Sequence, residues 1–210
     1  MDLWYRLGRF IFMLIFRYLF NFKVYGSENV PKTGGMILCM NHQSFVDPPM
    51  GGIAVRHRTV FYLARKTLWK NRLFGALLTS WHCIPVDQEK HDMSSLKKII
   101  KLLKEGYAVL LFPEGERCLD GKLQSGKPGV GLIVAKTGLP VVPMRIFGAH
   151  EAYPRGGKIK RSPVAIQVGK PIDMSELVAS LKGDKQGYQK IADAIMSAIA
   201  DLELQEPLEK

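Results

Sequence analysis

Short runs of apolar and β-branched residues recur along this 210-residue chain, with longer polar or amphipathic segments between them. Apolar runs of this length, bounded by turn residues, are typical of buried β-strands. Because the intervening segments are long enough to hold helices, we predict an α/β fold with a mostly parallel central sheet flanked by helices. The predicted strands are residues 36–40, 59–64, 83–86, 107–112, 141–147 and 164–169.

Two segments have the residue spacing of amphipathic helices. In the first, leucines and isoleucines between positions 96 and 103 form one face, and four lysines form the other. Asp92 or Ser94 can cap its start and Gly106 can end it. The second predicted helix covers residues 188–204. A chain of this length with 47% hydrophobic residues is the size of one ordinary domain with a substantial core.

The N-terminal segment is rich in Leu, Ile and Phe but is too interrupted by charge to span a membrane. Its longest uncharged run, residues 10–16, is far below the roughly 20 residues that a span requires. On a helix, Asp2, Arg6, Arg9 and Arg17 share one narrow arc, and apolar residues cover much of the rest. We therefore predict a membrane-associating amphipathic helix in residues 1–25, followed by an α/β domain over residues 26–210. The alternative is a basic helix packed on the protein's own core.

The charge of the chain indicates an anionic partner. A net charge of +11 and an isoelectric point near 9.6 fit nucleic acid, an anionic membrane or phosphorylated substrates. The basic residues are dispersed and form no recognised nucleic-acid motif, so we expect no nucleic-acid partner. The three cysteines are odd in number and lack C-x-x-C spacing, which fits a reducing cytosol, and the histidines show no metal-site spacing.

The first segment with chemical potential is residues 41–47, NHQSFVD, directly after the first predicted strand. The carboxyl ends of strands are where open α/β sheets usually bind ligands. Five positions apart on a helix, His42 and Asp47 would diverge by about 140°, so the chain must turn for them to meet, and Pro48 and Pro49 fit such a turn. If they meet, the carboxylate fixes one imidazole tautomer and leaves the other nitrogen to act as a general base. The alternative is a structural histidine held by an aspartate.

The second such segment is residues 112–117, FPEGER, at the end of the fourth predicted strand. Pro113 and Gly115 bracket Glu114 and place Arg117 in a tight loop. The guanidinium of arginine is a planar fork that suits bidentate recognition of phosphate. Taken alone, this segment is also compatible with an ordinary surface turn.

Together, N-H-x-S-x-x-D and, about seventy residues later, F-P-E-G-x-R resemble the glycerolipid acyltransferase family, whose best-known members are 1-acylglycerol-3-phosphate acyltransferases. Residues 121–129 are similar to the family's D-G-x-L…K-x-G segment, and Val142-Pro143 is similar to its late V-P motif. The resemblance runs from about residue 26 to residue 148. The basic, hydrophobic N-terminal helix is similar to the family's membrane anchor.

The resemblance implies roles for individual residues. His42 would be the base that acts on the acceptor hydroxyl, and Asp47 its orienting partner. The implied residues of the substrate site, including those that support the catalytic turn, are Asn41, Ser44, Glu114, Gly115, Arg117 and Lys127.

The chain departs from the family pattern at several positions. Asp87 stands where the family usually has a phosphate-binding arginine, Glu116 stands where it usually has threonine, and Cys118 stands where serine is common. The basic residues that we expect to compensate for the missing arginine are Arg56, Arg65, Lys66 and Lys127.

The expected function is transfer of a fatty-acyl group from a thioester, acyl-CoA or acyl carrier protein, to the sn-2 hydroxyl of 1-acylglycerol 3-phosphate, giving phosphatidic acid. The alternative is another lysophospholipid or an aminolipid as acceptor. The thioester is already activated, so we expect no metal and no cofactor beyond this co-substrate.

The expected partners are a lysophospholipid, the thioester donor and an anionic membrane surface. We expect peripheral attachment to the cytoplasmic face of the cell membrane. A catalytically idle membrane-binding protein of the same fold is a rival, against which the intact His42 and Asp47 argue.

Overall fold

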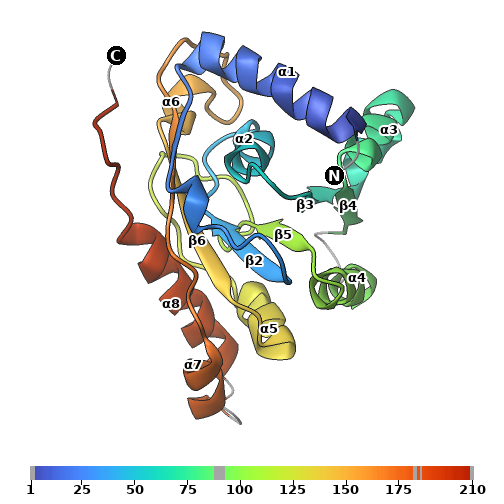
Figure 1. Cartoon of the computed structure of the whole chain (residues 1–210), viewed down its shortest axis with the longest axis vertical. Coiled ribbons are helices and arrows are strands. Elements are labelled where there is room, and N and C mark those ends of the chain that lie inside the picture. Colours follow the sequence, from blue (N-terminus) through green and yellow to red (C-terminus); the bar gives the residue numbers. More distant parts are fainter. Residues whose placement is uncertain (1–2, 88–92, 182–183, 185, 209–210) are drawn as a thin grey trace.

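The structure, a computed structural model, describes residues 3–87, 93–181, 184 and 186–208. Within these residues, seven strands form one sheet in the order β1-β7-β6-β2-β5-β3-β4 (Figure 1). Each predicted strand is present to within one residue at either end. The strands are β1 Lys23–Tyr25, β2 Met36–Met40, β3 Val60–Arg65, β4 Cys83–Val86, β5 Ala108–Leu111, β6 Val141–Phe147 and β7 Ala165–Val168.

The sheet is mostly parallel, as the alternation of strands and helices predicts. β2 pairs in parallel with β5 and β6, β3 pairs in parallel with β4 and β5, and β1 pairs in parallel with β7. The exception is β7, which runs antiparallel to β6. β2 therefore lies in the middle of the sheet, and its carboxyl end leads into residues 41–47.

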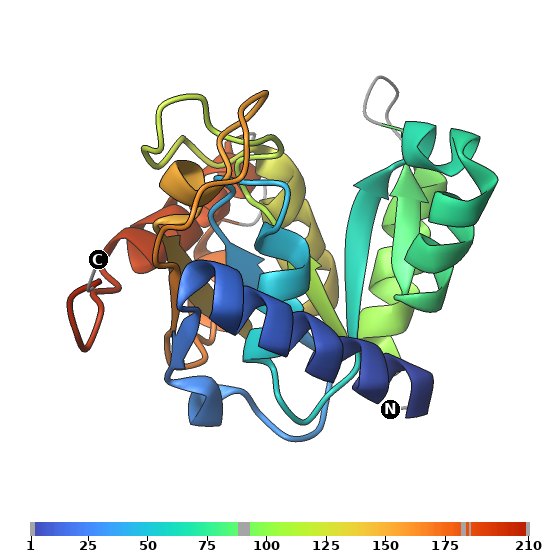
Figure 2. The ribbon, with the colours of Figure 1, turned by 90° about the horizontal axis from the view of Figure 1, so that it is seen from above.

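Helices cover both faces of the sheet. Figure 1 shows α1 and α2 on one face and α4, α5 and α8 on the other, and Figure 2 shows α1 running across the first face. α3 packs beside β4 at the edge of the sheet. The helices are α1 Leu3–Phe20, α2 Asp47–Ala54, α3 Arg72–Ser80, α4 Met93–Lys104, α5 Pro128–Thr137, α6 Ala149–Ala152, α7 Ser175–Ser180 and α8 Gly187–Ala200, with 3-10 turns η1 Ser27–Asn29 and η2 Lys66–Lys70.

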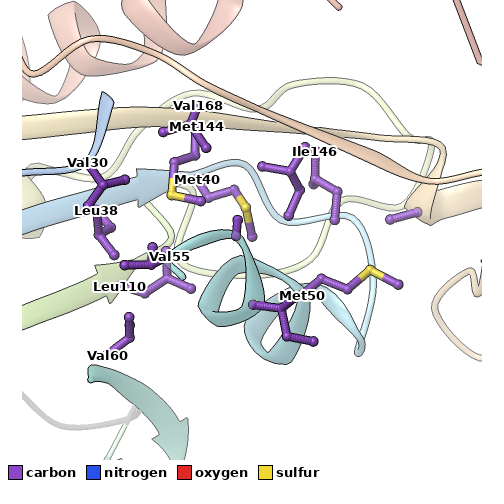
Figure 3. Close-up of a cluster of buried hydrophobic side chains, with 14 of the residues drawn as sticks. Val30, Leu38, Met40, Met50, Val55, Val60, Leu110, Met144, Ile146 and Val168 are labelled. Atoms are coloured by element: carbon purple, nitrogen blue, oxygen red, sulfur yellow. The ribbon is translucent and has the colours of Figure 1, made fainter. Parts of the chain in front are cut away.

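The core is divided by the sheet into two layers, and successive residues of the central strands alternate between them. In β2, Leu38 and Met40 join the layer beneath α1 and α2, while Ile37 and Cys39 join the layer beneath α5 and α8. Figure 3 shows the first layer, in which Met50 of α2 lies close to side chains of the sheet. This packing fixes the end of β2 relative to the start of α2.

Both sides of α1 are apolar. The inner side buries Tyr5, Phe16 and Phe20 in the protein. The predicted helix is present but ends at Phe20, and Lys23–Tyr25 of the predicted helical segment form β1 and pair with β7 instead. The outer side is a continuous set of exposed large hydrophobic residues, which we call the outer face of α1: Leu3, Trp4, Leu7, Phe10, Ile11, Leu14, Ile15 and Tyr18. The division at residue 25 stays a prediction, although α1 shares one core cluster with the sheet.

The predicted arc suggested that all arginines of α1 face solvent, but one of them does not. Arg9 is buried and donates hydrogen bonds to the carbonyl oxygens of Ile53, at 3.2 Å, and Arg58, at 3.3 Å. Arg6 and Arg17 are exposed. The reason is the position of Arg9 over the carboxyl end of α2, where unpaired carbonyl groups favour a cation. Among the described helices, none combines the length and apolar character that crossing a bilayer requires.

The two amphipathic helices predicted from spacing are present. α4 begins at Met93, so Ser94 lies within its first turn instead of capping it, and Asp92 lies outside the described residues. Gly106 ends the helix in a left-handed conformation with φ of 91°, as predicted. The predicted helix over 188–204 is α8, which is shorter at its carboxyl end.

Candidate active site

His42 and Asp47 meet because the chain turns between β2 and α2. Nδ1 of His42 lies 2.8 Å from Oδ2 of Asp47. The same carboxylate oxygen accepts hydrogen bonds from the backbone N–H groups of Gln43 and Ser44, both at 2.6 Å. The turn lies before Asp47, and the two prolines that follow belong to the first turn of α2, where proline is tolerated.

The Asp47 carboxylate is an anchor for this turn. Its side chain is fully buried, whereas that of His42 is 16% exposed. Burial raises the pKa of Asp47, and the hydrogen bonds from His42 and from the two backbone amides oppose that rise. Because Nδ1 is the nitrogen that faces Asp47, Nε2 is left to face a substrate.

The imidazole of His42 is held flat against a phenyl ring. The centroids of the His42 and Phe112 rings are 4.0 Å apart, with an angle of 20° between the ring planes. Phe112 directly follows β5, which neighbours β2 in the sheet. The stacking therefore fixes the ring plane, while Asp47 fixes its rotation in that plane.

The loop of residues 112–118 is joined by backbone and side-chain contacts to residues 41–47, which we call the catalytic turn after their predicted role. The N–H of Cys118 donates to the carbonyl oxygen of His42 at 2.9 Å, and Oε1 of Glu114 accepts from the N–H of His42 at 3.4 Å. Gly115 allows this loop its shape, because its φ is +75° and a Cβ there would lie 2.8 Å from the side chain of Lys127. The two sequence segments therefore form one structural unit.

Glu114 lies behind the catalytic turn. It is 2% exposed, and its Oε2 has no hydrogen-bond partner within the described part of the chain. Burial raises the pKa of Glu114 to about 7; hydrogen bonds from the backbone amides of residues 42 and 124 oppose the rise, and the nearby Asp47 adds to it. Glu114 therefore contacts the backbone of His42, and its role as a substrate-site residue stays a prediction.

Asn41 and Ser44 also contact the protein's own backbone. The amide of Asn41 exchanges two hydrogen bonds with the backbone of Ile146 in β6, at 2.8 and 3.1 Å. Oγ of Ser44 donates to the carbonyl oxygen of Tyr153 at 2.7 Å. Both side chains are buried, so they are placed to support the turn, and contact with substrate stays a prediction for them.

A cavity of about 550 Å³ opens beside His42 on the α1 and α2 side of the sheet. This volume is within the usual range of small-molecule sites. Most of the wall is apolar, and Phe12 and Phe16 of α1 form part of it. The other large apolar side chains in the wall include Tyr62, Phe74, Leu77 and Trp81.

Arginines supply most of the charge in the cavity wall. Arg117 lines it and lies over the ring of Phe45, with 5.6 Å from Cζ to the ring centroid, and its role in binding substrate stays a prediction. Arg65, one of the expected compensating residues, also lines the wall, and so does Arg155, which sequence reasoning missed. Arg155 follows β6 by several residues and belongs to neither sequence motif.

Lys127 lies on the far side of the same loop. Its Nζ is 3.3 Å from Oε1 of Glu116, and it lines a second, smaller cavity of about 350 Å³ between α4 and α5. Gly115 and Leu63 line both cavities, so the two meet at the loop. Within the described ranges, no group of three or more His, Cys, Asp or Glu side chains is placed to hold a metal ion, and the absence of a metal stays a prediction.

Comparison with known proteins places this geometry in context. Residues 21–147 match the family model described as Acyltransferase. A 1-acyl-sn-glycerol-3-phosphate acyltransferase of Bacillus subtilis is 32% identical over 185 residues, which cover 86% of this chain and 87% of that protein. The relative of the same name from Streptococcus pneumoniae is 25% identical, and the alignment covers 87% of this chain and 66% of that protein.

A solved structure has the same architecture. The crystal structure of the 1-acyl-sn-glycerophosphate (LPA) acyltransferase PlsC from Thermotoga maritima superposes with a TM-score of 0.69 at 26% identity. The superposition covers 90% of this chain and 77% of that chain. The chain spans half the length of a chloroplastic relative from Brassica napus, to which it is 29% identical.

Proposed function

Because this chain belongs to the acyltransferase family, we propose that it transfers a fatty-acyl group from a thioester to the sn-2 hydroxyl of 1-acylglycerol 3-phosphate, giving phosphatidic acid. The observation that carries the proposal is the 2.8 Å contact of His42 with Asp47 on the wall of an apolar cavity that also holds arginines. The acceptor named for the relatives from Bacillus subtilis and Thermotoga maritima supports this choice.

The geometry supports direct attack by the acceptor hydroxyl on the thioester. Nε2 of His42 takes the hydroxyl proton as the oxygen bonds to the thioester carbonyl carbon, and Asp47 stabilises the resulting imidazolium. The tetrahedral intermediate then collapses, the carbon–sulfur bond breaks, and the imidazolium returns its proton to the departing thiolate. The products are the ester and the free thiol, without a metal or a covalent enzyme intermediate.

The cavity fits the two ends of a lysophospholipid. Its apolar wall, to which Phe12 and Phe16 contribute, suits an acyl chain. Arg117 suits the phosphate, because its planar fork donates two parallel hydrogen bonds to phosphate oxygens. The hydroxyl between chain and phosphate is the group that must then reach His42.

The outer face of α1 supports attachment to a membrane surface. It presents eight large hydrophobic side chains to solvent, and the exposed Arg6 and Arg17 add attraction to anionic lipids. This face supports peripheral attachment, and the side of the cell membrane that we propose for it is the cytoplasmic one. Since α1 also forms part of the cavity wall, substitutions on its outer face test this attachment better than deletion of the helix.

The test is transfer by the purified full-length chain, with His42→Ala purified in parallel. Lysophosphatidic acid, other lysophospholipids and an aminolipid are each offered with acyl-CoA and with acyl carrier protein as donor. We expect phosphatidic acid as the main product, and little product from His42→Ala. Transfer only to acceptors without a phosphate monoester would contradict the proposed acceptor and favour the alternative. The comparison of donors identifies the carrier.

A further inference from the structure

Three arginines from three separate segments line the cavity beside His42. Arg65 ends β3, Arg117 belongs to the loop after β5, and Arg155 belongs to the connection between β6 and β7. Glu116, the acidic residue in the place of a usual threonine, lines the same wall. The wall therefore carries more positive than negative charge, although Asp87 stands where the family has an arginine.

Arg155 is held in place by a defined turn. The N–H of Gly157 donates to the carbonyl oxygen of Pro154 at 3.0 Å, and Gly156 has φ of +77°. These features are typical of a type II turn, with Arg155 at its first central position. The preceding Tyr153 is the residue whose carbonyl oxygen accepts from Ser44 of the catalytic turn, at 2.7 Å. Ser44 thus links the position of Arg155 to that of His42.

Glu116 lies between two cations. Its Oε2 is 3.8 Å from Nη1 of Arg155, and its Oε1 is 3.3 Å from Nζ of Lys127. All three side chains are partly exposed, so water screens both contacts and each contributes little to stability. A phosphate monoester carries about −1.5 to −2 charge at pH 7 and offers three acceptor oxygens, so it binds an arginine more strongly than this exposed carboxylate does.

We propose that Arg155 binds the acceptor phosphate together with Arg117, and that Glu116 occupies Arg155 in the free protein and is displaced by the phosphate. This inference rests on the proposed function and specifies how the head group is recognised. Arg155 supplies the positive charge that position 87 lacks in this chain. Glu116 acts as an intramolecular competitor for Arg155. A head group is therefore retained only if it binds Arg155 more strongly than Glu116 does.

The competing explanation is that the contact of Arg155 with Glu116 only holds the two loops in shape. In that case, removing either residue would disturb all ligands and the melting temperature alike. A phosphate role instead changes only the binding of ligands that carry a phosphate. The two explanations therefore differ in whether the affinity for phosphate-free ligands and the melting temperature change along with the affinity for phosphate-bearing ligands.

The experiment compares Arg155→Gln, Arg155→Lys, Glu116→Gln and the double variant Arg155→Gln/Glu116→Gln with wild type. Lys158→Gln is the matched control, since Lys158 is exposed and lies three residues further along the same connection. For each protein we measure kcat and KM for lysophosphatidic acid, the inhibition constants of a long-chain alkyl phosphate and of the neutral alcohol of equal length, and the melting temperature.

We expect Arg155→Gln to raise KM and the alkyl phosphate inhibition constant about tenfold, because one charged hydrogen-bonding group is lost, and to change kcat little. Arg155→Lys should recover part of the loss. Glu116→Gln should lower both constants, and this gain should shrink in the double variant because it acts through Arg155. The alcohol, the Lys158→Gln protein and the melting temperatures should show little change.

The inference is overturned if Arg155→Gln and Lys158→Gln have the same KM, or if the alkyl phosphate and the alcohol lose affinity equally. It is also overturned if Glu116→Gln has the same effect with and without Arg155. Wild-type transfer to lysophosphatidic acid together with any of these three results leaves the proposed function standing. If the wild type transfers only to phosphate-free acceptors, both the inference and the proposed function are overturned.

Discussion

Glu114 makes the stability of this protein depend on pH near neutrality. It is almost fully buried behind the catalytic turn, and its pKa is raised from 4.5 to about 7. Folding therefore favours the protonated carboxyl. As pH rises from 4.5 towards 7, the unfolded chain loses this proton before the folded chain does, so the folded state becomes less stable. This contribution is fully present below pH 4.5 and is lost as pH rises through about 7.

The size of the effect follows from the two pKa values. Each pKa unit corresponds to about 1.4 kcal/mol, so a rise from 4.5 to about 7 costs up to about 3 kcal/mol once Glu114 is ionised in both states. Glu114→Gln keeps an oxygen that can accept from the N–H of His42 but removes the ionisation. The variant should therefore lack this part of the pH dependence.

The assay is urea unfolding at pH 5 and at pH 8, for wild type, Glu114→Gln and the control Glu151→Gln. Glu151 is an exposed carboxyl in α6, so its replacement is the same chemical change made at a site where no carboxyl is buried. We expect the free energy of unfolding to fall between the two pH values by up to about 2.5 kcal/mol more in wild type and in the control than in Glu114→Gln.

Glu114→Gln also destabilises the protein for a reason unrelated to ionisation. The buried Nε2 of the glutamine has no acceptor, because Oε2 of Glu114 has no partner among the described residues. This loss of stability is the same at both pH values, so it drops out of the difference between them. If Glu114→Gln loses as much stability as wild type between pH 5 and pH 8, Glu114 is ionised in the folded protein at both, and the reasoning from burial is wrong.

Three further predictions concern the site and the membrane. His42→Ala should lower kcat by about 10² to 10⁴-fold at an unchanged melting temperature, and Asp47→Asn should lower it less; near wild-type turnover by His42→Ala would refute the general base. Arg117→Lys should raise KM for lysophosphatidic acid about tenfold and leave the thioester's KM unchanged, which steady-state kinetics with each substrate varied in turn will check. Leu14→Glu should weaken sedimentation with anionic vesicles while micellar activity is kept, whereas Tyr188→Glu, on α8 away from α1, should bind as wild type does.

The strands and the amphipathic helices could be predicted because their signals are local. Buried central strands are continuous apolar runs, and α4 carries its apolar face and its final glycine in its own sequence. The helix α2 was not predicted, because Asp47-Pro48-Pro49 is also typical of a turn. The three-residue β1 is too short for a periodic pattern. The direction of β7 depends on the path of the connection after β6, which no spacing within either strand encodes.

The residues of the site also divide into those with a local sequence signal and those that only the tertiary structure brings into place. His42, Asp47, Gly115 and Arg117 belong to two compact segments, each directly after a strand, and neighbouring strands bring such segments together. Arg155 lies far along the chain and reaches the cavity only through the turn that Ser44 holds. Likewise, the burial of Arg9 depends on where α1 crosses α2, so the arc of charge on an isolated helix could not show it.

The position of α1 affects how the energy of substrate binding is distributed. This single helix separates the cavity from the outside of the protein. Phe12 and Phe16 line the cavity, and Leu14 and Tyr18 are exposed on the outer face of α1. For a protein whose α1 lies on a bilayer, a lipid tail that enters the cavity moves from one hydrocarbon phase to another, so its transfer free energy is close to zero. Discrimination among lipids then falls to the polar head, and occupancy follows the mole fraction of lysolipid in the membrane instead of its concentration in water.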